Sequence, residues 1–141
     1  MKAVVIGCGR VGSAVAKDLV TEGWDVIAVD EKEDALMRLG PDWRGGFVLG
    51  HGMDTGVLEV AGIGAADAAI VATNGDNTNL VIAQVLQRRY EIGTVVVRVL
   101  DPARAAFYAE RGLHTICPTQ TAISELLAAV RVSRRAHAES S

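Results

Sequence analysis

Short apolar runs rich in Val, Ile and Ala recur along the chain at intervals of about 20 residues, separated by more polar segments. Runs of this length and composition predict buried strands. There are six of them: Ala3–Ile6, Val26–Val29, Phe47–Leu49, Ala68–Ala72, Thr94–Val99 and His114–Cys117. The segments between them carry apolar residues at helical spacing, such as Val11, Val15 and Leu19, or helix-ending glycines. The pattern therefore predicts an alternation of strands and helices.

Such alternation is typical of right-handed βαβ units built on one parallel sheet. We expect an α/β fold of three layers, a Rossmann-like doubly wound parallel sheet of six strands in the order 3-2-1-4-5-6. At 141 residues the chain is long enough for one domain and too short for two ordinary ones. We assign residues 1–118 to this Rossmann-type domain. Glycines that follow predicted helices are expected to be C-caps: Gly23, Gly40, Gly62, Gly64, Gly93 and Gly112.

Residues 119–141 are predicted to form a C-terminal helix with a basic tail. Its apolar residues share one helical face and are Ile123, Leu126, Leu127 and Val130. Its later basic residues are Arg131, Arg134, Arg135 and His137. Two interpretations stay open. The helix closes the domain, with its cations near the negative end of the helix dipole, or it is a dimer contact or linker.

Composition and charge exclude several classes of protein. A formal net charge of −3 gives no electrostatic drive toward nucleic acid or an anionic membrane, so we expect no nucleic-acid partner. No apolar run approaches the roughly 20 residues that span a bilayer, so we expect no direct membrane insertion. Cys8 and Cys117, without a CxxC pair or a signal peptide, are typical of a reduced cytoplasmic setting. No His, Cys or carboxylate spacing resembles a metal site.

The first predicted strand is followed by Gly7-Cys8-Gly9-Arg10-Val11-Gly12, a GxGxxG pattern that opens a helix. In such a turn the first glycine allows the tight bend, the second lets backbone N–H groups approach a pyrophosphate, and the third lets helix and strand pack closely. The helix N-terminus then faces the anion. Because glycines occur in many loops, the pattern needs support from the rest of the chain.

Asp30 supplies that support, since it ends the second strand 18 residues after Gly12. A dinucleotide fold places there the carboxylate that binds ribose hydroxyls. The alternative is that residues 30–33 form a capping box that opens the second helix. The acidic pair Asp30 and Glu31 also favours NAD(H) or an adenine nucleotide over NADP(H), although Lys32 weakens that exclusion.

Arg10 departs from an ordinary dinucleotide turn. A cation in the first helical turn is unfavourable unless an anion lies nearby. Its planar guanidinium is suited to a bidentate phosphate contact, and the alternative is a side chain in solvent. Cys8, in the same turn, is either a thiol of lowered pKa or a small packing residue.

Polar residues also follow the fourth strand. Thr73 and Asn74 are expected to face the ligand at the switch point of the sheet. The alternative reading is a turn at Asn74-Gly75, with Asp76 capping the next helix.

Three further candidates end other strands of the sheet. Arg98 lies near the end of a Val-rich strand, where its charge is expected to reach a phosphate or an acid such as Asp101. Gly50 and His51 end the third strand and are expected near the adenine or ribose. No residue is left over for a catalytic acid–base pair.

These motifs together resemble the nucleotide-binding N-terminal domain of bacterial potassium-uptake regulators and ligand-gated potassium channels, called the KTN, TrkA-N or RCK domain. The resemblance covers roughly residues 1–130. The segments that carry it are Val5–Gly12, Val29-Asp30, Leu58–Ile63, Ala72-Thr73 with Asn79-Leu80, and Val97–Val99 with Asp101-Pro102. An arginine inside the glycine turn makes this set more specific than GxGxxG alone.

The resemblance implies a regulatory domain rather than an enzyme. Such a domain binds NAD(H) or ATP/ADP and signals the occupied state to a membrane-embedded potassium transporter or channel subunit. It is cytoplasmic, peripheral to the inner face of the membrane through that partner, and forms a homodimer or a larger ring. The resemblance assigns phosphates to residues 7–11, the ribose to Asp30, the crevice side of the ligand to Thr73 and Asn74, and a phosphate to Arg98.

Glu110 matches a position that approaches a neighbouring subunit's nucleotide in ATP-binding relatives. Two departures stand out: Gly50-His51 replaces the Gly-Asp common in the family, and we expect no second ligand-binding domain, frequent in such regulators, within these 141 residues. The chain is then either a stand-alone subunit or a fragment. Two other functions stay open: an NAD-dependent oxidoreductase or a fragment of one, and an adaptor whose nucleotide site has lapsed.

Overall fold

The computed structural model describes residues 1–140, and its strands form one parallel sheet in the order β3-β2-β1-β4-β5-β6. The strands are β1 (Lys2–Ile6), β2 (Asp25–Asp30), β3 (Gly46–Leu49), β4 (Ala68–Val71), β5 (Thr94–Arg98) and β6 (His114–Ile116). Each lies at one of the six predicted apolar runs. The predicted fold class and strand order are therefore confirmed.

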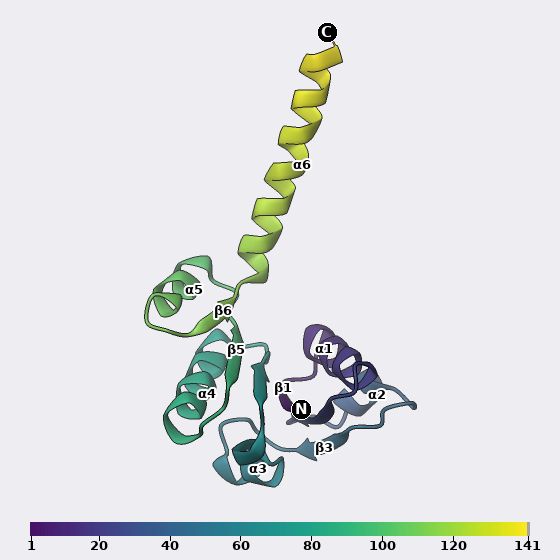
Figure 1. The fold of residues 1–141 in the computed structure, drawn as a ribbon, viewed down its shortest axis with the longest axis vertical. Helices are drawn as coiled ribbons and strands as arrows, with labels where there is room; N and C mark the ends of the chain where they lie inside the picture. Colours follow the sequence, from purple (N-terminus) through teal and green to yellow (C-terminus); the bar gives the residue numbers. More distant parts are fainter. Residues whose placement is uncertain (141) are drawn as a thin grey trace.

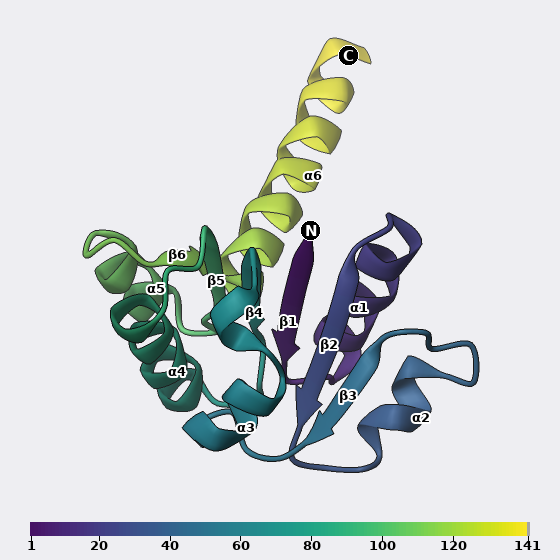
Figure 2. The same cartoon turned by 60° about the horizontal axis from the view of Figure 1, so that its bottom comes forward.

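Helices cover the two faces of the sheet, as Figures 1 and 2 show. In chain order, the helices of residues 1–140 are α1 (Arg10–Thr21), α2 (Ala35–Leu39), α3 (Thr55–Val60), the 3-10 helix η1 (Ile63–Ala65), α4 (Asp76–Arg89), α5 (Pro102–Ala109) and α6 (Pro118–Ser140), and α6 does not pack on the sheet. The helices α1 and α2 pack on one face, whereas α3, α4 and α5 pack on the other.

The core divides in two because successive strand residues point to opposite faces. In β1, Val4 and Ile6 join the larger apolar cluster under α3, α4 and α5. Ala3 and Val5 join the smaller cluster under α1 and α2, which is rich in alanine. These small side chains let α1 lie close to the sheet, and that brings its N-terminus to the carboxyl end of β1.

Two local predictions are wrong. The segment after β2 is not a capping box, because α2 begins only at Ala35, and the Asp30 carboxylate accepts from the N–H groups of Cys8 and Lys32, which lie outside that helix. Of the glycines expected to be C-caps, Gly23, Gly40, Gly62 and Gly112 have positive φ, whereas Gly64 and Gly93 do not. The helix before Gly93 ends instead at Tyr90 in extended backbone.

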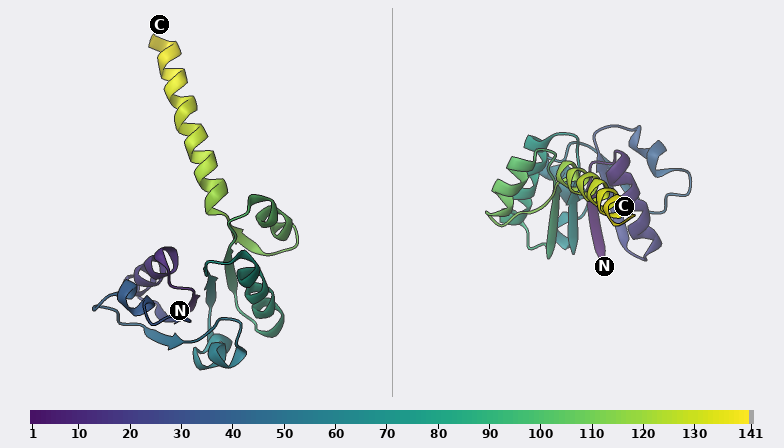
Figure 3. Two further views of the ribbon diagram at one scale, coloured as in Figure 1. Left: turned by 180° about the vertical axis from the view of Figure 1, so that it is seen from behind. Right: turned by 90° about the horizontal axis from the view of Figure 1, so that it is seen from above.

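The last helix, α6, extends away from the sheet edge instead of folding back onto it (Figure 1 and the left view of Figure 3). None of its described residues is buried, and Leu126 and Val130 are 69% and 67% exposed. The interpretation of a helix that closes the domain is therefore wrong. Among residues 1–140, no helix has both the length and the apolarity to cross a membrane.

Candidate functional site

A pocket of about 570 Å³ opens at the carboxyl ends of the strands, where the order of the sheet reverses between β1 and β4. In doubly wound sheets this switch point is the usual ligand crevice. The pocket brings together every site residue predicted from sequence except Gly12: Gly7, Cys8, Gly9, Arg10, Val11, Asp30, Glu31, Gly50, His51, Thr73, Asn74 and Arg98.

Two glycines shape the turn beneath this pocket. Gly7 has a φ of 93°, and a Cβ there would lie 2.6 Å from the Thr73 backbone nitrogen. A Cβ on Gly12 would overlap the Gly7 carbonyl oxygen. Gly12 therefore allows α1 to approach the end of β1, as expected, although it does not itself line the pocket.

The N-terminus of α1 points at the pocket without a side-chain cap. Its N-cap residue is Gly9, and no acidic side chain lies in the first turn. A Cβ on Gly9 would meet no atom within 4 Å. The free N–H groups and the positive end of the helix dipole therefore face an open space suited to an anion.

Asp30 lies across from this turn at the end of β2. Its carboxylate accepts hydrogen bonds from the backbone N–H groups of Cys8 at 2.8 Å and Lys32 at 2.9 Å. These contacts fix the carboxylate beside the glycine turn and leave its remaining lone pairs available to hydroxyl donors.

Cys8 is a packing residue. Its side chain is buried in the alanine-rich cluster. Burial raises the pKa of its thiol to about 12, and the nearby Asp30 carboxylate adds to the rise. The alternative of a thiol with a lowered pKa is therefore wrong, because desolvation of the thiolate outweighs the hydrogen bond to Val29 and the positive charge of Arg38, which both lower the pKa.

The end of β4 is held to the end of β5 by a buried amide. Asn79 of α4 is 1% exposed, and its side chain accepts from the backbone N–H and the hydroxyl of Thr73. It donates to the carbonyl oxygens of Thr73 at 3.0 Å and Arg98 at 2.9 Å. The Arg98 guanidinium in turn donates to the Thr73 carbonyl oxygen at 2.6 Å.

Two of the alternatives that involve neighbouring acids are wrong. Arg98 does not pair with Asp101, whose carboxylate instead caps α5 by accepting from the Ala103 N–H. Asp76 does not cap α4. Its carboxylate accepts from the backbone N–H groups of Leu100 and Asp101, across the gap between two loops.

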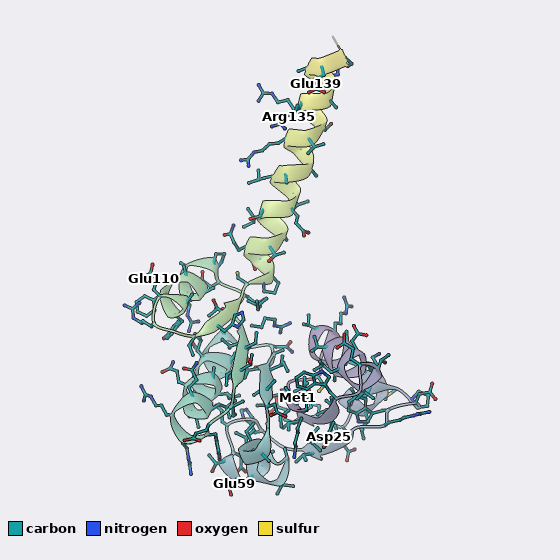
Figure 4. All side chains as sticks on the ribbon, viewed as in Figure 1. Met1, Asp25, Glu59, Glu110, Arg135 and Glu139 are labelled. Carbon is teal, nitrogen blue, oxygen red and sulfur yellow. The ribbon has the colours of Figure 1, made fainter. Side chains whose placement is uncertain are left out.

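His51 lies at the rim of the pocket. Its Nε2 is 3.7 Å from a Glu31 carboxylate oxygen, and its Nδ1 accepts from the Met53 backbone N–H. Glu110, labelled in Figure 4, is the C-cap residue of α5. It is exposed and lies outside the residues that line the pocket.

Sequence reasoning missed several lining residues, and the most informative are Lys32 and Arg38. With Arg10 and Arg98 they put four cations around the pocket. The only ion pair within residues 1–140 joins His51 to Glu31, so none of these cations has a carboxylate within 4.0 Å there. Arg38 was not predictable because α2 is only five residues long and its direction depends on packing against α1.

Fold and pocket together define a class: a Rossmann-type domain with a nucleotide-binding turn at the sheet's switch point. Comparison with known families gives the particular one. The TrkA-N domain model matches residues 3–119, so the chain belongs to the TrkA-N domain family. The resemblance drawn from the sequence motifs is confirmed.

Relatives named Trk system potassium uptake proteins are similar over most of the chain. The TrkA of Streptomyces coelicolor is 35% identical over 90% of this chain and 57% of its own length. The TrkA homolog of Methanothermobacter thermautotrophicus is 32% identical over 89% of this chain and 58% of its own length. The chain thus spans a little over half the length of these two relatives.

Solved structures share the fold at lower identity. The Kef CTD of Shewanella denitrificans in its AMP-bound form has a TM-score of 0.77 and 22% identity, covering 96% of this chain and 88% of that one. The GsuK channel bound to NAD has a TM-score of 0.68 and 17% identity, covering 83% of this chain and 21% of that one.

Proposed function

We propose that this chain is a regulatory domain of a potassium transport system. It binds NAD(H) or ATP/ADP in the pocket at the switch point, and the occupied state gates a membrane-embedded potassium transporter or channel subunit. The domain is cytoplasmic and reaches the inner face of the membrane through that partner.

The observation that carries the proposal is the unpaired positive charge around the glycine turn. Arg10 is exposed in the first turn of α1, where the helix dipole disfavours a cation without an anion nearby. Lys32, Arg38 and Arg98 line the same pocket, again without a carboxylate partner in residues 1–140. Phosphate groups over the uncapped N-terminus of α1 supply the missing negative charge.

The opposite side of the pocket suits the rest of a nucleotide. The Asp30 carboxylate lies beside the turn, where it accepts hydrogen bonds from the ribose hydroxyls of the nucleotide. Gly50 and His51 border the adenine, and Thr73 and Asn74 border the crevice side of the ligand. Structures of similar fold that carry AMP or NAD support a ligand of this class.

A homodimer or a larger ring completes the domain. The apolar stripe of α6 lacks a partner within its own chain. On the face that carries α1 and α2, Ile70 of β4 and Val96 of β5 are only partly buried. We propose that α6 of a second copy covers this part of the sheet, so that each chain supplies what the other lacks.

The rival function is an NAD-dependent oxidoreductase or a fragment of one. The relatives named as potassium uptake proteins favour regulation. Turnover of NADH with a small substrate would instead favour the oxidoreductase.

Calorimetric titration with NADH, NAD, ATP, ADP and AMP tests the nucleotide site. We expect saturable binding of at least one of them at one site per chain. If none of the five nucleotides binds, the remaining hypothesis is an adaptor whose nucleotide site has lapsed. Light scattering before and after removal of residues 119–141 tests the dimer, and equal monomer masses for both proteins at high concentration would refute it.

A further inference from the structure

The buried amide of Asn79 does not line the pocket, yet all of its hydrogen bonds reach two residues that do. A primary amide has two N–H donors and an oxygen with two lone pairs. In Asn79 the donors reach the carbonyl oxygens of Thr73 and Arg98, and the oxygen accepts from the N–H and hydroxyl of Thr73. All the hydrogen-bonding groups of the Asn79 amide therefore have partners, and the amide joins the ends of β4 and β5.

This arrangement holds Arg98 at two points. Asn79 binds the carbonyl oxygen of Arg98 and so fixes its backbone. It also binds the Thr73 carbonyl oxygen, which is the acceptor of the Arg98 guanidinium. The Asn79 amide thus positions both the backbone of Arg98 and, through the Thr73 carbonyl group, its guanidinium.

The Arg98 guanidinium still has donors for a ligand. Its Nε is buried without a hydrogen-bond partner and so does not face the open pocket. Of its four Nη–H groups, one donates to the Thr73 carbonyl oxygen. Because Arg98 lines the pocket, and a guanidinium N–H binds anionic oxygens strongly, the other Nη–H groups suit an anionic ligand there.

We propose that Asn79 is a positioning residue for nucleotide binding: it holds Arg98 so that the free Nη–H groups of its guanidinium donate to the bound nucleotide. This inference rests on the proposed function of the pocket. Asn79 itself touches no ligand and acts through Arg98 and the Thr73 carbonyl group.

A double-mutant cycle tests this assignment. The protein is titrated with ADP and NADH in four forms: wild type, Asn79→Asp, Arg98→Gln and the double variant. Asn79→Asp keeps the side-chain shape but turns a donor into an acceptor that faces two carbonyl oxygens. Loss of one charge-assisted hydrogen bond corresponds to about a tenfold rise in Kd for each single variant. Since both changes remove the same contact, the double variant is expected to lose no more than the weaker-binding single variant.

Asn77→Asp is the matched control. It introduces the same change two residues away on α4, where the side chain is exposed and contacts Arg104 outside the pocket. We expect its Kd to change less than twofold. A loss equal to that of Asn79→Asp would assign the effect to added negative charge and overturn the proposal.

Other outcomes of these experiments also test the proposed role of Asn79. Losses that multiply in the double variant mean that Asn79 acts independently of Arg98, which overturns this inference alone. Absence of binding to the wild type overturns the proposed function and this inference with it. If Asn79→Asp does not fold, Asn79→Ser, which keeps a hydroxyl donor, replaces it in the cycle. Unfolding of both variants would show a purely structural role and overturn the positioning role.

Discussion

Alanine substitutions at Gly9 and Gly12, three residues apart in the glycine turn, are expected to have opposite effects on stability. At Gly12 a Cβ would overlap the Gly7 carbonyl oxygen, so α1 must move away from the end of β1. Overpacking of this kind costs about 1–3 kcal/mol. At Gly9 a Cβ meets nothing within 4 Å, and the backbone φ of −75° suits any residue. Gly9→Ala is therefore expected to leave stability unchanged or raise it by about 0.4–1 kcal/mol.

The two substitutions are also expected to differ in their effect on nucleotide binding, with the larger effect at Gly9. The open space at Gly9 is where phosphate oxygens would approach the backbone N–H groups. A methyl group there should weaken binding of ADP or NADH by about tenfold or more, the equivalent of about 1.4 kcal/mol. Gly12→Ala should affect binding only as far as it unfolds or displaces α1.

Chemical denaturation and calorimetry on both variants measure these effects. The denaturant midpoint should fall for Gly12→Ala and not for Gly9→Ala, while Kd should rise for Gly9→Ala in fully folded protein. An unchanged midpoint in Gly12→Ala would refute the packing role of that glycine. An unchanged Kd in Gly9→Ala would show that no phosphate lies over the turn.

Three further variants probe separate parts of the chain. Arg10→Ala removes an exposed cation and should weaken ADP or NADH binding about tenfold, with the unfolding free energy changed by less than about 0.5 kcal/mol; unchanged affinity in calorimetry would place the side chain in solvent. The pKa of Cys8 is raised from 9.0 to about 12, so between these values the folded protein keeps a proton that the unfolded chain releases. Stability should therefore fall as pH rises through this range. Denaturant midpoints of Cys8→Ala should fall less steeply with pH, and equal slopes would contradict the shift. Leu126→Arg places a charge on the 69% exposed apolar stripe of α6 and should lower the dimer mass in light scattering, whereas an unchanged dimer would move the interface elsewhere.

The fold was largely predictable because the central strands β1, β2, β4 and β5 contain buried residues and therefore read as short apolar runs. The edge strands β3 and β6 contain no buried residue, and their even spacing along the chain indicated them instead. The glycine turn and Asp30 were also predictable, since both are set by backbone geometry at fixed distances from those strands. The pocket accordingly gathers the predicted residues with the exception of Gly12, which packs beneath it.

The failures concern side chains whose partners lie far away in the sequence. Asp30 and Asp76 both stand where a local helix cap is expected. Each instead accepts backbone N–H groups from a distant loop: Asp30 from Cys8, in addition to the nearby Lys32, and Asp76 from Leu100 and Asp101. Asn79 was recognised only as part of a motif, because its role depends on two strands that meet only in the folded sheet.

The prediction that α6 closes the domain was wrong for a different reason. Its amphipathic pattern shows that one face needs a partner, but a pattern does not say which chain supplies it. Local propensity and periodicity describe an element, whereas its neighbours are set by the tertiary and quaternary structure.

Calorimetric titration of the purified wild-type chain with ADP and NADH, repeated with Arg10→Ala and Gly9→Ala, tests the central claim most directly. The account predicts saturable binding at one site per chain, weakened about tenfold or more in both variants. No binding to the wild type, or binding with equal affinity in all three proteins, would contradict a nucleotide site at the glycine turn.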